Sequence, residues 1–179
     1  ATAVGVSDVV DGWRDQRRNG GVVLELPSGR VVASGLSMPH SPRWHHGRLW
    51  LLNSGTGHFG SVCPESGRFE PMTFCPGYLR GLAFVDHYAI VGMSRPRNDP
   101  TFSGLALDAE LAKRSAEPRC GLMVIDLHSG SVAHWLRVEG LVRELYDVAV
   151  LPRVVRPMAL GFKSDEIQRI ISVGEDGDL

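Results

Sequence analysis

The stretch GGVVLELPSGRVVASG at residues 20–35 contains the unit that decides the fold, two apolar runs on either side of a Ser-Gly pair. FGSVCPESGRFEPMTF at 59–74 and CGLMVIDLHSGSVAHWLRV at 120–138 have the same arrangement. Glycine readily adopts the positive φ that a tight turn between two strands requires. Each stretch is therefore predicted to form a β-hairpin, with its turn at Ser28-Gly29, Ser66-Gly67 or Ser129-Gly130.

A second unit, two short apolar runs around a polar turn, follows each hairpin. It occupies residues 38–54, 78–94 and 145–164, and TAVGVSD at residues 2–8 matches its second half. The hairpin glycines Gly29 and Gly67 lie 38 residues apart, and Gly67 and Gly130 lie 63 apart. A four-stranded propeller blade takes roughly 40–45 residues. The first spacing therefore fits one blade, and the second fits one blade with an insertion.

These repeats predict an all-β fold, a β-propeller fragment of three to four four-stranded blades from a larger six- or seven-bladed ring. Residues 1–179 are expected to form this single partial domain. The predicted strands lie near 2–7, 21–26 and 30–35; 41–45, 48–53, 58–63 and 68–74; 80–85, 88–93, 120–126 and 131–138; and 146–151, 157–162 and 166–172. Three to four blades are too few to close a ring. Missing N-terminal blades or a second chain are therefore expected to complete it.

Composition narrows the classes of partner. The chain has 19 Lys and Arg against 20 Asp and Glu, so no nucleic-acid partner is expected. No apolar run is long enough to span a membrane. The three cysteines, an odd number without C-x-x-C spacing, argue against a disulfide framework or a structural zinc site. A cytoplasmic protein with reduced thiols is the expectation.

Several longer stretches resemble a known family. They are GLSMPHSPRWHHGRLWLLNSGTG at 35–57, YLRGLAF at 78–84, TFSGLALDAELAKR at 101–114, EPRCGL at 117–122 and ELYDVAVLPRVVRPMALGFKSDEI at 144–167. The chain resembles the C-terminal half of an uncharacterised bacterial group, domain of unknown function 4915. The resemblance implies that the family motif includes His40, Trp44, Asn53, Arg80, Arg119, Asp147 and Lys163, and it assigns no activity.

Aligning the repeats places His40, Arg80 and Asp147 where each innermost strand begins, around the mouth of the central channel. Histidine can transfer a proton near neutral pH. Arginine binds carboxylates and phosphates in a bidentate manner, and aspartate can orient a base. These three are the candidate catalytic residues. The alternative is structural: Arg80 and Asp147 would form a salt bridge between blades, and His40 would cap a turn.

Two insertions, at 8–19 and 94–119, follow the second strand of their blades and are expected on the same face as these residues. The second insertion is predicted to contain a short helix near 107–115. The candidate ligand-binding residues are Trp13, Arg14, Asn53, Arg95, Arg97 and Lys163. Their charge makes the face basic and favours an anionic ligand. Alternatively, the loops only pack on the face or contact missing blades.

Three functions remain open from the sequence. The first is binding of a small molecule or peptide without chemistry. The second is a hydrolase, lyase or isomerase in which His40 is the acid or base with Arg80 and Asp147. The third is a scaffold for protein partners. No cofactor is expected, and a metal in the central channel, held by His40 and Asp147, is a weaker alternative. Trp44, Trp50 and Trp135 are predicted to pack between blades.

Overall fold

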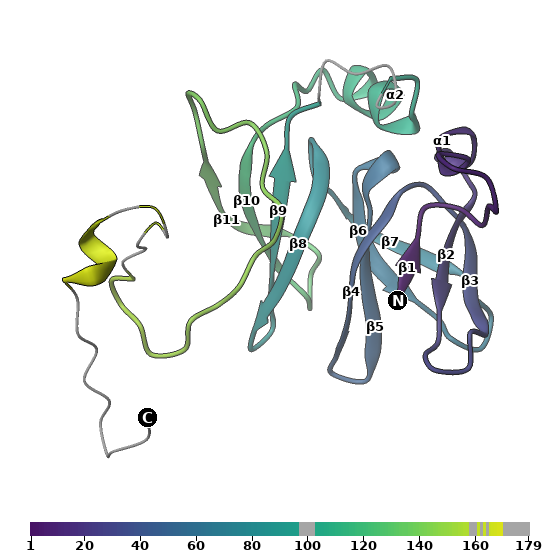
Figure 1. The fold of residues 1–179 in the computed structure, drawn as a ribbon, viewed down its shortest axis with the longest axis horizontal. Coiled ribbons are helices and arrows are strands. Elements are labelled where there is room, and N and C mark those ends of the chain that lie inside the picture. The colour runs from purple at the N-terminus through teal and green to yellow at the C-terminus, as the bar shows by residue number, and fades with distance from the viewer. Residues whose placement is uncertain (97–102, 158–160, 162, 164, 170–179) are drawn as a thin grey trace.

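The fold is an array of three antiparallel β-sheets, seen in a computed structural model that describes residues 1–96, 103–157, 161, 163 and 165–169. The first sheet has the order β1-β2-β3, the second β4-β5-β6-β7 and the third β8-β9-β10-β11. Figure 1 shows them standing side by side. The strands are β1 Thr2–Ala3, β2 Gly21–Leu24, β3 Val31–Leu36, β4 Pro39–His45, β5 Arg48–Asn53, β6 His58–Val62, β7 Phe69–Phe74, β8 Tyr78–Val85, β9 Tyr88–Ser94, β10 Gly121–Asp126 and β11 Val132–Arg137.

The all-β prediction is confirmed, and the strands of these sheets lie close to their predicted positions. The three Ser-Gly pairs occupy the turns β2–β3, β6–β7 and β10–β11. Gly29, Gly67 and Gly130 have φ of 73°, 68° and 70°, values that side chains disfavour. The three turns predicted at the Ser-Gly pairs are therefore confirmed.

The two insertions contain the helices of the sheet array. α1 (Trp13–Gln16) lies in the connection between β1 and β2, and α2 (Ala106–Lys113) lies between β9 and β10. In Figure 1 both helices lie at the same end of the sheets. Leu107 and Leu111 of α2 pack with Met38 and Tyr78, which begin or precede inner strands. No helix in the described ranges is long and apolar enough to cross a membrane.

The predicted fourth blade is not observed in the described part of the chain. Residues 146–151 form no strand, and Asp165–Gln168 is a 3-10 helix where a strand was expected near 166–172. Most of the strand predicted near 157–162 lies outside the described residues, as do residues 170–172. A segment becomes a β-strand only when an adjacent strand supplies its hydrogen-bond partners. Residues 146–151 have no such neighbour among the described strands.

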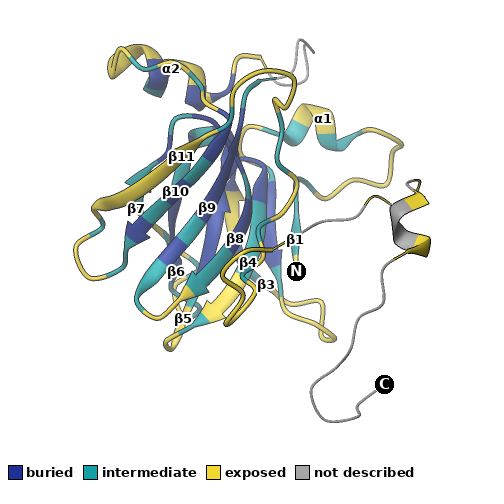
Figure 2. Ribbon diagram, turned by 90° about the vertical axis from the view of Figure 1, so that its left-hand side faces the viewer, coloured by how far each residue is buried: buried dark blue, intermediate teal, exposed yellow. Residues whose placement is uncertain are grey.

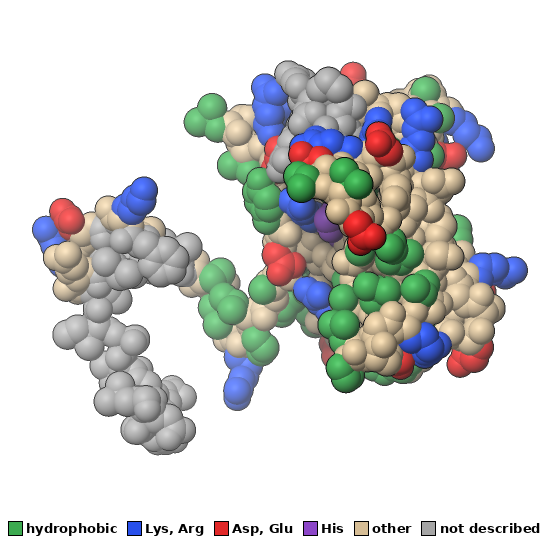
Figure 3. Space-filling model, turned by 45° about the vertical axis from the view of Figure 1, so that its right-hand side comes forward, with side chains coloured by type: hydrophobic (Ala, Val, Ile, Leu, Met, Phe, Trp, Pro, Cys, Tyr) green, Lys and Arg blue, Asp and Glu red, His purple; other side chains and the backbone are tan. Residues whose placement is uncertain are grey.

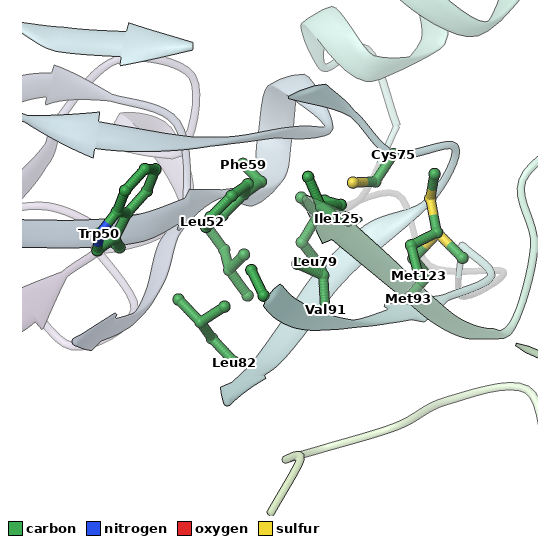
Figure 4. Close-up of a cluster of buried hydrophobic side chains, with 11 residues drawn as sticks. Trp50, Leu52, Phe59, Cys75, Leu79, Leu82, Val91, Met93, Met123 and Ile125 are labelled. Carbon is green, nitrogen blue, oxygen red and sulfur yellow. The ribbon is translucent and has the colours of Figure 1, made fainter. Parts of the chain in front are cut away.

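The core lies between the sheets. Val23, Ala33 and Leu36 of the first sheet pack against Leu51 and Val62 of the second. Figure 4 shows the larger cluster between the second and third sheets, where side chains from both sheets point toward one another. Its members are Trp50, Leu52, Phe59, Cys75, Leu79, Leu82, Ala89, Val91, Met93, Met123 and Ile125. The second sheet is therefore covered on both faces, which explains the continuous apolar run in β5.

The tryptophan prediction is correct for Trp50 and wrong for the other two. Trp50 stacks on Phe59, with ring centroids 5.1 Å apart. Trp44 is 66% exposed and Trp135 is 69% exposed. In Figure 2, β11 is exposed along most of its length, whereas β9, on the other side of β10, is largely buried. One face of the third sheet packs on the second sheet. Among the described residues, no further sheet packs on its opposite face.

Candidate functional site

A cavity of about 520 Å³ opens at the end of the sheets that carries the two helices. Figure 3 shows a histidine side chain in a hollow on this side, next to a Lys or Arg side chain and close to acidic ones. The described lining residues come from the ends of inner and second strands, from both insertions and from the segment that follows β11. They are Val4, Trp13, Met38, His40, Ser54, Tyr78, Leu79, Arg80, Ser94, Arg95 and Glu144.

His40 and Arg80 reach the cavity from matching irregularities in β4 and β8. The register of β4 shifts between His40 and Arg43, and that of β8 shifts between Leu79 and Leu82. Ser41 follows His40 and has φ 52°, and Gly81 follows Arg80 and has φ 81°. The backbone is therefore in the left-handed region directly after each of these two cavity residues. The Gly81 N–H donates to Ser41 Oγ at 3.1 Å. Such bulges redirect side chains, and here they link the two strands that present His40 and Arg80.

Burial and a neighbouring charge keep His40 neutral. Burial, followed by the positive charge of Arg80, lowers the pKa of His40 to about 4. At pH 7 the ring therefore has one N–H donor and one acceptor nitrogen. Neither nitrogen makes a hydrogen bond within the described residues. The ring can therefore hydrogen-bond a molecule in the cavity without breaking a protein contact.

The charged groups of the lining are Arg80, Arg95 and Glu144. The Arg80 guanidinium lies over the Tyr146 ring, 5.0 Å from its centroid. The Arg95 N–H donates to the Arg143 carbonyl at 2.9 Å, which holds the start of the second insertion beside residues 143–145. With His40 neutral, two positive charges and one negative charge face the cavity. Burial, and then Asp108, raises the pKa of Tyr78, so its hydroxyl stays protonated and polar.

Asp147 is not among the described lining residues, contrary to its predicted place beside His40 and Arg80. Its side chain is 67% exposed and forms an ion pair with Arg43 at 3.7 Å. Its Oδ1 also accepts a hydrogen bond from the Val148 N–H at 2.9 Å. Among the described ion pairs and hydrogen bonds, Asp147 joins neither His40 nor Arg80.

Two contacts between successive repeats align Asp147 differently. Ser54 Oγ donates to the Leu79 carbonyl, and Ser94 Oγ donates to the Leu145 carbonyl at 3.2 Å, which aligns Leu145 with Leu79 and Tyr146 with Arg80. Ser41 Oγ accepts from the Gly81 N–H, and a Cβ on Gly81 would clash with the Val148 nitrogen, which aligns Asp147 with Arg80. The segment therefore follows no single register beside β8, and the Asp147 side chain pairs with Arg43 instead of lining the cavity.

The other predicted residues have mixed placements. Trp13 and Arg95 line the cavity. Arg14 stacks on Trp13 at 4.9 Å and pairs with Asp11 at 3.6 Å. The buried Asn53 accepts a hydrogen bond from the Ser37 N–H at 2.8 Å through Oδ1, a structural role. Lys163 is exposed and is not a described lining residue, and Arg97 lies outside the described residues.

Sequence reasoning missed Met38, Tyr78 and Glu144, which occupy one equivalent position in three repeats. When the repeats are aligned on the serine contacts, each comes one residue before Pro39, Leu79 or Leu145. Ser54 and Ser94 were also missed as a pair, although both end a second strand. An alignment anchored on these serines, rather than on the polar residues, would have found all five.

A metal centre finds no support in the described ranges. No group of three or more His, Cys, Asp and Glu side chains lies close enough together there to hold an ion. His45 and His46 both place Nε2 near the Asp86 carbonyl, at 2.9 and 3.2 Å, in the turn between β4 and β5. The three cysteines are free thiols, with Cys75 and Cys120 buried.

One family model matches the part of the chain that forms the three sheets and the cavity. No curated protein matches the chain. A family model described as "Domain of unknown function (DUF4915)" matches residues 1–160 of the 179 residues, which include every described residue that lines the cavity. The chain therefore belongs to the DUF4915 family.

Proposed function

We propose that the cavity binds a small molecule with an anionic group and an apolar body. The observation that carries this proposal is the convergence of Arg80, Arg95 and a neutral His40 on one cavity. Arginine forms strong paired hydrogen bonds with carboxylates and phosphates. The His40 N–H adds a donor that no described protein group uses. Donors of this kind favour an acceptor-rich, negatively charged group.

The rest of the lining suits an apolar or aromatic body. Val4, Met38 and Leu79 contribute aliphatic surface, and Trp13 and Tyr78 contribute rings. Ligand sites commonly combine such apolar walls with a few polar groups that fix orientation. Glu144 disfavours a second negative charge near it, so a ligand with one anionic end fits better than a polyanion.

We also propose that the three sheets are blades of a propeller. The spacing of the repeats, the sequential order of strands in each sheet and the adjacency of the inner strands β4 and β8 support this arrangement. In it the cavity lies at the mouth of the central channel, where strands of several blades meet. Binding is favoured over catalysis, because no described hydrogen bond gives His40 an acidic partner.

The proposal is tested with phenylacetate and its neutral isostere phenylacetamide, titrated into the protein by calorimetry at pH 7. Phenylacetate should bind at least tenfold more tightly, because a hydrogen bond to a charged group contributes about 1.5–3 kcal/mol. The variant Arg80→Gln should remove most of this difference. Arg43→Gln is the matched control, since Arg43 pairs with Asp147 outside the cavity. Equal affinity of acid and amide would refute an anion site.

A further inference from the structure

The charged groups of the cavity lining gather on the side of the third sheet. Arg80 belongs to β8, Arg95 directly follows β9, and Glu144 lies in the segment after β11. The Arg95 N–H donates to the Arg143 carbonyl at 2.9 Å. The Arg80 guanidinium lies over the Tyr146 ring, 5.0 Å from its centroid. The two arginines therefore contact residues on either side of Glu144, and all three charges belong to one end of the cavity.

Glu144 is held at this place through both of its neighbours in the chain. The Arg143 carbonyl before it accepts the Arg95 N–H. The Leu145 N–H after it donates to Ser94 Oγ at 2.9 Å, and the Leu145 carbonyl accepts a hydrogen bond from the same hydroxyl at 3.2 Å. Ser94 and Arg95 line the cavity themselves. The fold thus builds a carboxylate into a described lining whose other charged groups are positive.

The opposite end of the cavity is apolar. Val4 and Trp13 follow β1, and Met38 comes directly before β4. In Figure 1 the first sheet, to which β1 belongs, and the third sheet lie on opposite sides of the second. The cavity therefore has an end with charges of both signs and an end with an aromatic ring and aliphatic side chains.

A ligand with only a negative charge does not use all of the charged end. It is attracted by Arg80 and Arg95 but repelled by Glu144. An ammonium group on the same ligand offers N–H donors and the opposite charge to the Glu144 carboxylate. The acceptor nitrogen of the neutral His40 ring can take another of these donors. Charges of both signs at one end and an apolar body at the other are features of an α-amino acid with an apolar side chain.

Resting on the anion site proposed above, we infer that the ligand is a free α-amino acid with an aromatic or large aliphatic side chain. Arg80 and Arg95 donate to its carboxylate, and its ammonium group donates to Glu144. Its side chain lies against Trp13 and Met38, where a ring gains from stacking. The cavity of about 520 Å³ is within the usual range of small-molecule sites, ~300–1,000 Å³.

The test compares three acids by calorimetry at pH 7: L-phenylalanine, 3-phenylpropanoate and N-acetyl-L-phenylalanine. 3-Phenylpropanoate has the same carbon skeleton without the ammonium group. The acetylated acid keeps the nitrogen but not its charge, and it resembles the C-terminus of a peptide. L-Phenylalanine should bind at least tenfold more tightly than either of the others, because hydrogen bonds between charged groups are the stronger ones.

A variant assigns this preference to its residue. Glu144→Gln should remove the preference for L-phenylalanine and leave the affinity for 3-phenylpropanoate unchanged or higher, because a negative charge leaves the cavity. Glu139→Gln is the matched control, since Glu139 also lies after β11 but pairs with Arg137 at 2.9 Å and is not a described lining residue. Circular dichroism checks the fold of both variants, and their affinity for 3-phenylpropanoate checks the anion site.

The possible failures are distinguishable. Equal affinities of the three acids for the unmodified protein would overturn the amino-acid inference and leave the anion site standing. Tighter binding of the acetylated acid would indicate a peptide C-terminus and also overturn it. A preference for L-phenylalanine that persists in Glu144→Gln would contradict the role of this carboxylate. Absence of binding by all three acids would overturn the anion site as well.

Discussion

The second and third sheets have equivalent side chains on the face toward the next sheet, yet among the described residues a further sheet covers that face only in the second. Trp50 and Phe59 of the second sheet are 3% and 0% exposed, because the third sheet packs on them. Ile90 and Leu122 occupy the equivalent positions of the third sheet and remain half-buried. The same strand pattern therefore gives a core or a surface according to what stands beside it.

The largest expected effect comes from matched leucine truncations on these two faces. Leu52→Ala should lower the free energy of unfolding by about 2–5 kcal/mol, because it empties a fully buried site. Leu122→Ala should cost about 1 kcal/mol, since solvent already reaches this side chain. Urea unfolding at pH 7 measures both. Equal losses would show that the open face of the third sheet is covered.

A smaller difference should separate the two serines that join successive repeats. Ser54→Ala leaves the buried Leu79 carbonyl without its bond and should cost about 1–3 kcal/mol. Ser94→Ala removes bonds to Leu145, whose segment belongs to no described sheet, and should cost less than about 1 kcal/mol. The comparison uses thermal unfolding at pH 7. A larger loss for Ser94→Ala would mean that residues 145–148 are held as firmly as β8.

The smallest effect concerns thiol accessibility. Complete burial raises the pKa of Cys75, inside the filled interface, to about 12. Burial also raises the pKa of Cys120, but this residue borders the groove beside Trp135. With a thiol reagent at pH 8, Cys63 should react first, Cys120 next and Cys75 only on global unfolding. Trp135→Ala should accelerate only Cys120. Acceleration of Cys75 as well would show that Trp135 also protects the interior of the cluster that the groove borders.

Sequence reasoning predicted the strands of three sheets and the helix α2, because turn glycines, apolar runs and helix spacing are local signals. It brought His40, Arg80, Trp13 and Arg95 to one end of the molecule by the alternation of strand direction. It could not place Asp147, because polar residues at the start of an extended segment align equally well in two registers. In the folded chain the serine bonds fit one register, and the contact of Gly81 with Val148 fits the other.

The sequence by itself determined where the chain turns and which segments are strands, since those depend on φ preferences and on the pattern of neighbouring residues. The tertiary structure alone decided which side chains share the cavity and which apolar face stays open. Those outcomes depend on the register between sheets and on the presence of a neighbour, and neither is encoded within a single strand.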